Sequence, residues 1–207
     1  MEKVIRERIK LKADELYYKY GIKSVTMDEI ASQLGISKKT IYLSYKDKDE
    51  LVDEVISDII IRNQHFCENA GAKARDAIHE SFLAMEMMQQ MYENLNPLIL
   101  FDLERNFPKT FNKFRDYKFN FLYDSIIKNL ESGKKEGLYR ENINNEVTAK
   151  IRLENMMLPF NQDIFPKNKF NLTLLQSELI IMYLFSIVTL KGYKLILKYQ
   201  AQSIKKV

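Results

Sequence analysis

The sequence predicts an all-α fold, and three observations support this class. Only 6 Gly and 4 Pro interrupt its 207 residues, and so few turn-forming residues favour long helices over short strands. Apolar residues recur at intervals of three and four, which is the period of one helix face. Hydrophobic residues make up 46% of the chain, which is enough to bury a core and argues against global disorder. We expect about nine helices.

Three short helices are predicted at the N-terminus. Thr26 and Glu29 have the spacing of a capping box, in which the hydroxyl accepts from a free amide of the first turn and the carboxylate reaches back to the cap amide. Gly35 ends this second helix, and Ser37 opens the third. The predicted helices therefore span 4–20 and 27–34, with a third that begins at Ser37.

Six further helices are predicted in the rest of the chain. A second capping box at 47–50 starts a helix that runs to about residue 69. Proline and glycine positions, such as Pro97, Pro108 and Gly137, separate the others, because the residue before a proline avoids helical angles. These helices are predicted over 74–94, 97–105, 109–133, 145–158 and 172–200.

Composition limits the cellular setting. The single Cys67 excludes an intramolecular disulfide and fits a reducing compartment. Charged residues interrupt the first turns, so no secretory signal is expected. The longest apolar stretch, 179–190, is roughly half of what a membrane span needs. We therefore expect a soluble cytoplasmic protein with no membrane partner.

The first three helices have the pattern of a helix-turn-helix, with a glycine at the second turn. Residues 36–48 hold four lysines against one aspartate, a local net charge of +3 in a chain whose formal net charge is +4. Such a concentration suits the neutralisation of DNA phosphates. Lysine runs are more often a solvated face, and Thr26 can serve only as a cap, so both interpretations stay open on these residues alone.

At these positions the sequence resembles the TetR family of bacterial transcriptional repressors. About fifty residues carry the resemblance, and they match in order and spacing: Ile9, Ala13, Leu16, Tyr17, Gly21, Ile22, the segments 25–31 and 34–42, and the closing segment 45–51. The resemblance implies a helix-turn-helix DNA-binding domain over 1–47 and a ligand-binding and dimerisation domain over 48–207. It also implies double-stranded operator DNA as a partner.

The resemblance indicates which residues contact DNA. Phosphate contacts fall on Thr26, Thr40, Tyr42 and Lys48, and the base-reading surface falls on Ser37, Lys38 and Lys39. Local chemistry agrees at two of these positions. Thr26 lies at a helix N-terminus, where free amides suit a phosphate oxygen. Lys48 adds its ammonium to the positive end of a helix dipole.

Three positions of this segment depart from the commonest family pattern. Lys39 stands where a small residue is frequent, and Leu43 and Ser44 stand where an aromatic residue and histidine are frequent. Contacts at those last two positions are therefore in doubt. Tyr45 is expected to pack in the core of the small domain.

Methionine and aromatic residues of the C-terminal region are candidates for a small-molecule pocket. They are Phe82, Met85, Met88, Tyr92, Phe101, Tyr117, Phe121, Met156 and Phe160. Each one can equally fill an ordinary helical core. As a set, in the effector domain that the resemblance implies, they indicate a small apolar or amphipathic effector.

The last predicted helix, 172–200, is apolar around more of its circumference than one buried face requires. A second partner surface explains this, and the resemblance implies that the last helices pair across a two-fold axis as a four-helix bundle. The candidate interface residues are Leu179, Tyr183, Leu184 and Ile187. The alternative is a central helix buried within one chain.

Catalysis is not indicated. The chain has no glycine-rich phosphate loop, and Cys67 lacks a paired orienting group in sequence. Two histidines and one cysteine are a thin supply for a metal centre, although Asp76 and His79 have a suitable spacing. We expect no cofactor, no metal and no enzymatic activity.

The favoured function is a ligand-responsive repressor that acts as a homodimer on a palindromic operator. The alternatives are a DNA-binding regulator without an effector and a helical protein-interaction module.

Overall fold

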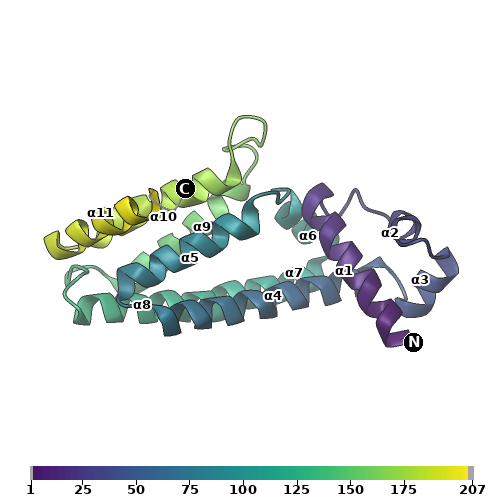
Figure 1. Ribbon diagram of the computed structural model, residues 1–207, viewed down its shortest axis with the longest axis horizontal. Coiled ribbons are helices and arrows are strands. Elements are labelled where there is room, and N and C mark those ends of the chain that lie inside the picture. The colour runs from purple at the N-terminus through teal and green to yellow at the C-terminus, as the bar shows by residue number, and fades with distance from the viewer. Residues whose placement is uncertain (1, 205–207) are drawn as a thin grey trace. The chain divides into compact units, whose positions relative to one another are not determined.

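The computed structural model describes residues 2–204 and confirms the all-α class (Figure 1). Within these residues the α-helices are α1 (Glu2–Tyr20), α2 (Met27–Leu34), α3 (Lys38–Ser44), α4 (Lys48–Lys73), α5 (Ala77–Tyr92), α6 (Ile99–Asn106), α7 (Pro108–Asp116), α8 (Tyr123–Lys135), α9 (Asn145–Met157), α10 (Leu172–Ile187) and α11 (Leu190–Ile204). A π-helical segment, η1 (Tyr117–Leu122), joins α7 to α8, and a 3-10 turn, η2 (Leu158–Phe160), follows α9.

Two compact units make up the chain. Unit 1 consists of Met1–Asn63 and Asn94–Tyr117, and unit 2 consists of Gln64–Glu93 and Lys118–Val207. Helix α4 is continuous, with residues 48–63 in unit 1 and residues 64–73 in unit 2. Helices α6 and α7 thus fold with the N-terminal helices. The functional boundary after residue 47 stays a prediction.

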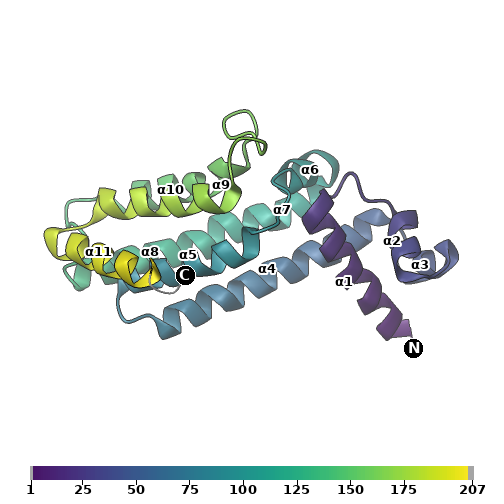
Figure 2. The ribbon, with the colours of Figure 1, turned by 45° about the horizontal axis from the view of Figure 1, so that its top comes forward.

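Unit 1 is built on a small core beneath α1, α2 and α3. Each of these helices contacts the other two, and the views in Figures 1 and 2 show α2 and α3 beside each other. Their apolar faces supply the buried side chains, which are Ile9, Ala13, Leu16, Tyr17, Met27, Ile30, Ala31 and Ile41. The turn between α2 and α3 needs Gly35, whose φ of +65° is a left-handed conformation that a glycine adopts without strain.

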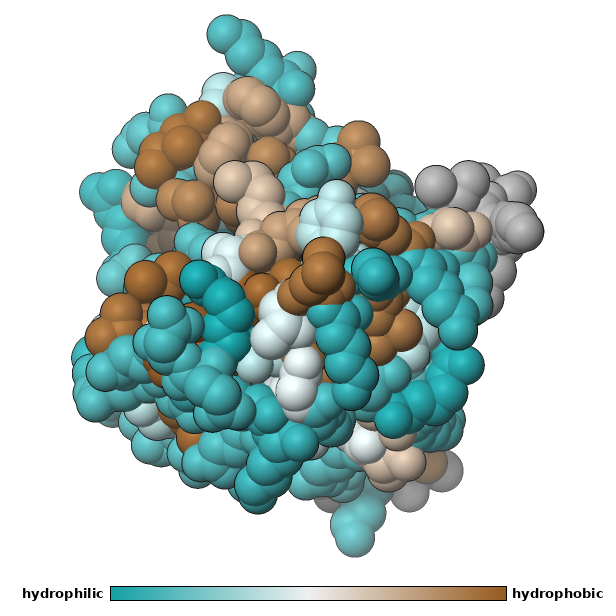
Figure 3. All heavy atoms as spheres, turned by 90° about the vertical axis from the view of Figure 1, so that its left-hand side faces the viewer, coloured by the Kyte–Doolittle hydropathy of each residue, from teal (hydrophilic) through white to brown (hydrophobic). Residues whose placement is uncertain are grey.

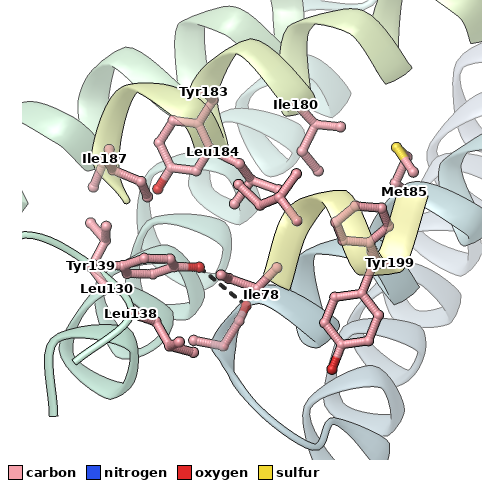
Figure 4. Close-up of a cluster of buried hydrophobic side chains, with 14 of the residues drawn as sticks. Ile78, Met85, Leu130, Leu138, Tyr139, Ile180, Tyr183, Leu184, Ile187 and Tyr199 are labelled. Carbon is pink, nitrogen blue, oxygen red and sulfur yellow. Dashed lines mark hydrogen bonds between the residues drawn. The ribbon is translucent and has the colours of Figure 1, made fainter. Parts of the chain in front are cut away.

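Unit 2 is a helical bundle in which α5 contacts α8, α10 and α11. Its core gathers side chains from these helices and from the loop after α8, as Figure 4 shows. Tyr139 lies in this core, and its single hydroxyl proton is shared between two acceptors, the carbonyl oxygen of Ala77 at 3.2 Å and Oδ1 of Asn129 at 3.0 Å. The loop after α8 is therefore held against the start of α5.

The predicted single helix over 172–200 is wrong, because two helices meet there. Helix α10 ends at Ile187 and α11 begins at Leu190. Between them the backbone pairs with the loop after α8: the amide of Arg140 donates to the carbonyl of Ile187, and the amide of Thr189 donates to that of Leu138, each at 2.9 Å. These long-range bonds replace the helical ones. Among residues 2–204 no helix is long and apolar enough to cross a membrane.

Gly133 allows Tyr139 to reach the core. A Cβ at Gly133 would lie 2.1–2.6 Å from ring carbons of Tyr139, so Gly133→Ala should displace the ring and lower the free energy of unfolding by about 1–3 kcal/mol. Gly71→Ala is the matched control, since the nearest atom to its Cβ is a carboxylate oxygen of Glu80 at 3.5 Å. It should stabilise its helix by about 0.5–1 kcal/mol. Urea denaturation measures both, and equal stability of the two variants would contradict this packing.

Candidate functional site

Helix α3 presents the exposed surface that the sequence predicted for base contacts. Ser37 caps the helix, because its Oγ accepts from the amide of Thr40 at 3.0 Å, and the two hydroxyl oxygens lie 2.8 Å apart. Ile41 is fully buried, whereas Lys38, Lys39, Tyr42 and Leu43 are exposed. Burial of one apolar residue therefore fixes the helix and turns its basic side toward solvent.

Helix α2 begins with a second capped N-terminus. The amide of Glu29 donates to Oγ1 of Thr26 at 3.1 Å, and the Thr26 side chain is exposed. A hydroxyl that accepts one hydrogen bond can still donate its own proton. Thr26 therefore serves as a cap and keeps a donor for a phosphate oxygen, as expected for a helix N-terminus.

Asp28 neutralises part of the basic surface. The Lys38 Nζ lies 2.8 Å from Oδ2 of Asp28, and both side chains are more than half exposed. The hydrogen bond and the negative charge of Asp28 raise the pKa of Lys38. Exposed pairs of this kind are weak, so an incoming phosphate can replace the carboxylate. Within residues 2–204, neither Lys39 nor Lys46 forms an ion pair through its side chain.

Lys48 points into unit 1 rather than toward the exposed side of α3. Its Nζ donates to the carbonyl oxygens of Ile22 at 2.6 Å and Val25 at 2.5 Å. The ammonium lies 5.8 Å from the ring centroids of Tyr17 and of Phe107, and burial lowers the pKa of Lys48. Two of the three N–H donors of Lys48 are thus used by the loop between α1 and α2. The phosphate contact that the sequence predicted for Lys48 stays a prediction.

The loop between α1 and α2 is held from a second side by α6. Buried Asp102 accepts through Oδ2 from the amide of Lys23 at 2.8 Å. The amide of Asn96 donates to the carbonyl of Tyr18 at 2.8 Å. We call the bonds of Lys48 and Asp102 to residues 22–25 the loop clasp. Sequence analysis missed Asp102, because nothing in its own segment indicates a partner 79 residues away.

The segment after α3 is fixed by Arg6. The guanidinium lies 4.0 Å from the ring centroid of Tyr45 and contacts the carbonyl of Ser44, Glu50 and Glu54. The backbone amide of Lys46, followed by the guanidinium of Arg6, lowers the pKa of Glu50. Tyr45 is fully buried and its hydroxyl donates to the carbonyl of Arg6 at 3.2 Å. The prediction that Tyr45 packs in the core is confirmed.

The predicted pocket residues do not form one set. Phe82, Met85, Met88 and Phe160 are buried in unit 2, where Tyr92 and Met156 pack against the same core. Phe121, in η1 of unit 2, is partly buried. Phe101 and Tyr117 belong to unit 1, and Phe101 is 52% exposed with Arg105 over its ring.

The predicted dimer residues lie mostly inside unit 2. Tyr183, Leu184 and Ile187 are buried in the core cluster, and Leu179 is partly exposed. The first three therefore cannot offer their side chains to a second copy, because α5 already covers that face of α10. The exposed apolar side chains are Leu174, Met182 and Phe185 on α10, and Leu190, Tyr193 and Leu197 on α11.

An open groove of about 540 Å³ lies on α11. Its lining consists of Leu138, Leu190, Lys191, Lys194, Leu195 and Lys198, and none of the predicted pocket residues. Figure 3 shows that apolar side chains gather in patches among hydrophilic ones on one face of the molecule.

Asp76, whose spacing from His79 would suit a metal site, caps α5 by accepting from the amide of His79 at 2.8 Å. Among residues 2–204 no group of three or more metal-binding side chains is present.

Sequence analysis also missed Arg152 on α9. Its side chain is 5% exposed, and its Nη1 is buried without a hydrogen-bond partner. The sequence does contain a signal for the burial of Arg152, because this residue lies one turn from Ala149 and one turn from Met156 on the same helix face. An arginine within an apolar stripe of that spacing indicates a buried cation.

Comparison with known proteins identifies the N-terminal segment. Residues 11–55 match the family described as bacterial regulatory proteins, tetR family. An HTH-type transcriptional regulator of Staphylococcus aureus is 32% identical over 83 residues, which cover 40% of this chain and 42% of that protein. The chain thus matches about two fifths of the length of this relative.

Solved structures resemble this fold over most of the chain. A TetR-family transcriptional regulator from Agrobacterium tumefaciens superposes with a TM-score of 0.77 at 15% identity, over 91% of this chain and 100% of that one. SmeT, described as the repressor of a multidrug efflux pump of Stenotrophomonas maltophilia, was solved in complex with triclosan. That complex gives a TM-score of 0.68 at 16% identity, over 90% of this chain and 92% of that one. At such identities the likeness concerns the fold.

Loss of the loop clasp should destabilise unit 1. Lys48→Met leaves the carbonyls of Ile22 and Val25 without their donor, so the free energy of unfolding should fall by about 1–3 kcal/mol. Lys46→Met removes the same charge from an exposed position and should change it by no more than about 0.5 kcal/mol. Urea unfolding compares the two variants. If both lose equally little, Lys48 does not hold the loop.

Proposed function

We propose that this chain, a member of the tetR family of bacterial regulatory proteins by its residues 11–55, is a DNA-binding regulator of transcription. One observation carries the proposal: the exposed side of α3 coincides with the part of the chain that the family match covers. A buried core and two capped helix N-termini hold the lysines and hydroxyls of this surface in place. Such a helix can enter the major groove as the second helix of a helix-turn-helix.

Each exposed residue has a role in the proposed DNA complex. Lys39, and Lys38 once released from Asp28, are long enough to reach guanine acceptors or phosphates. Thr26, Thr40 and Tyr42 donate hydroxyl hydrogen bonds to phosphates on either side of the groove. Ser37 caps α3 and borders the same surface. Lys48 supports this surface from inside through the loop clasp.

We further propose a homodimer on a palindromic operator. Two recognition helices about 34 Å apart contact two half-sites of one duplex. Leu174, Met182 and Phe185 form an exposed apolar stripe along α10, at intervals that place them on one face. Burial of this stripe against a second copy removes apolar surface from water, which lowers the free energy and favours a dimer.

The proposed regulator acts as a repressor and responds to a small apolar or amphipathic molecule in unit 2. Support comes from the binding of triclosan by SmeT, a repressor with the same fold. Continuous α4 belongs to both units and is the natural carrier of the signal. A hundredfold change in DNA occupancy requires only about 2.8 kcal/mol of differential affinity between two states.

Selection of bound sequences from random duplex DNA should yield a palindrome. With that duplex, Lys39→Ala should weaken binding and reduce the slope of log affinity against log salt by roughly one, because the complex loses one cation that offsets phosphate charge. Lys128→Ala, an exposed lysine of α8 in unit 2, should leave the slope unchanged. Recovery of no DNA even at low salt would reject the regulator and favour a protein-interaction module.

A charge within the α10 stripe should separate the subunits. Met182 is 64% exposed, so Met182→Glu should leave the helical signal and the stability of the monomer unchanged while producing monomers in light scattering. Leu184→Glu is a contrasting variant, because Leu184 is 1% exposed and a buried charge there should unfold unit 2. A Met182→Glu protein that stays dimeric would place the interface elsewhere.

A further inference from the structure

Unit 2 contains a buried cation without a counter-charge. Arg152 is 5% exposed, and no Asp or Glu among residues 2–204 forms an ion pair with it. Its Nη1 is buried and has no hydrogen-bond partner. The guanidinium carbon lies 5.3 Å from the ring centroid of Tyr183, a cation–π distance. The neighbouring acid Glu154 is exposed and pairs with Lys118 instead.

This arrangement is unfavourable unless an anion completes it. Buried charges in proteins are normally paired, since removal from water costs more than one aromatic contact returns. Burial lowers the pKa of Arg152 to about 10, so the guanidinium still carries its charge at pH 7. Helix α9 therefore brings a full positive charge into the interior of unit 2.

Two further buried polar atoms, both on α10, are also without hydrogen-bond partners. The hydroxyl of Tyr183 and Oε1 of Gln176 are buried and form no hydrogen bond. Both residues lie on the face of α10 that contacts α9, two turns apart. Nε2 of Gln176 donates to the carbonyl of Met156 at 2.8 Å, one turn from Arg152. Helices α9 and α10, which contact each other, thus carry a guanidinium, a hydroxyl and an amide oxygen whose hydrogen-bonding capacity is unused.

The surroundings of this polar group are apolar and aromatic. Tyr183 belongs to the core cluster in Figure 4. Phe160, which follows α9, packs edge-on against Tyr92 with the ring centroids 5.5 Å apart, and its turn η2 contacts both α9 and α10. A ligand that reaches Arg152 therefore needs an apolar or aromatic body behind its charged group.

We propose that Arg152 binds the carboxylate of a small organic monoacid, with Tyr183 donating a second hydrogen bond to it. This inference rests on the proposed function and specifies the chemical class of its effector. A planar guanidinium pairs bidentately with a carboxylate. A phosphate would bring a second negative charge that no further cation of this site balances, so a monoanion fits better.

Thermal unfolding of the full-length chain tests the site. The probes are straight-chain carboxylates of four to ten carbons and substituted benzoates, each compared with its neutral amide. At a hundredfold excess over Kd, a binding acid should raise Tm by roughly 5–10 °C, and its amide should not. Arg152→Met should abolish the shift. Arg140→Met, an exposed arginine of the same unit, should keep it. The inference is overturned if no acid raises Tm, or if acids raise Tm equally in Arg152→Met.

Two further measurements exclude a purely structural role for Arg152. Without ligand, Arg152→Met should unfold at the same or a higher temperature than the natural chain, because an unpaired buried charge has been removed. A lower Tm would show that Arg152 is already satisfied and would contradict the proposal. Tyr183→Phe keeps the ring, so it should keep the fold and weaken the binding acid about tenfold through one lost hydrogen bond; unchanged affinity would remove Tyr183 from the site.

DNA binding of the same protein separates this inference from the proposed function. An acid that binds through Arg152 yet leaves the DNA complex intact supports the site and rejects its role in regulation. Neutral molecules that release DNA, with no acid bound, would reject the carboxylate site while the ligand-responsive regulator stands.

Discussion

The exposed side of α3, which we propose contacts DNA, depends on one partly buried ammonium group. Lys48, the first residue of α4, donates to two carbonyls of the loop between α1 and α2, and Asp102 accepts an amide from the same loop. These bonds fix where α2 begins, and α2 in turn packs against α3. The direction in which α3 presents its lysines is therefore set by polar contacts inside unit 1, as much as by the burial of Ile41.

Partly buried Lys48 and buried Arg152 differ in the partners that the folded chain gives their charges. The ammonium of Lys48 has two carbonyl acceptors and lies in the field of Asp102, so the folded chain already satisfies it. The guanidinium of Arg152 lies over the ring of Tyr183, and its Nη1 has no hydrogen-bond partner. A basic residue thus stabilises a loop in unit 1, and another, in our proposal, binds a ligand in unit 2.

Local signals in the sequence were sufficient for the helix starts and for the exposed side of α3. Thr26 and Ser37 cap their helices as predicted, since capping depends on residues three positions apart. The break between α10 and α11 could not be predicted, because its backbone pairs with Leu138 and Arg140, which lie far earlier in the sequence. The burial of Leu184 was equally hidden, because a helix that is apolar all round does not show which face its own chain covers. The inward direction of Lys48 is a tertiary property of the same kind.

Amine labelling of the lysines, with and without operator DNA, tests the central claim most directly. In the free protein, exposed Lys39 should react readily and Lys48 slowly, and bound DNA should protect Lys39 without changing the reaction of Lys48. The account would be contradicted if Lys48 reacts as fast as Lys39 in the free protein and becomes protected by DNA.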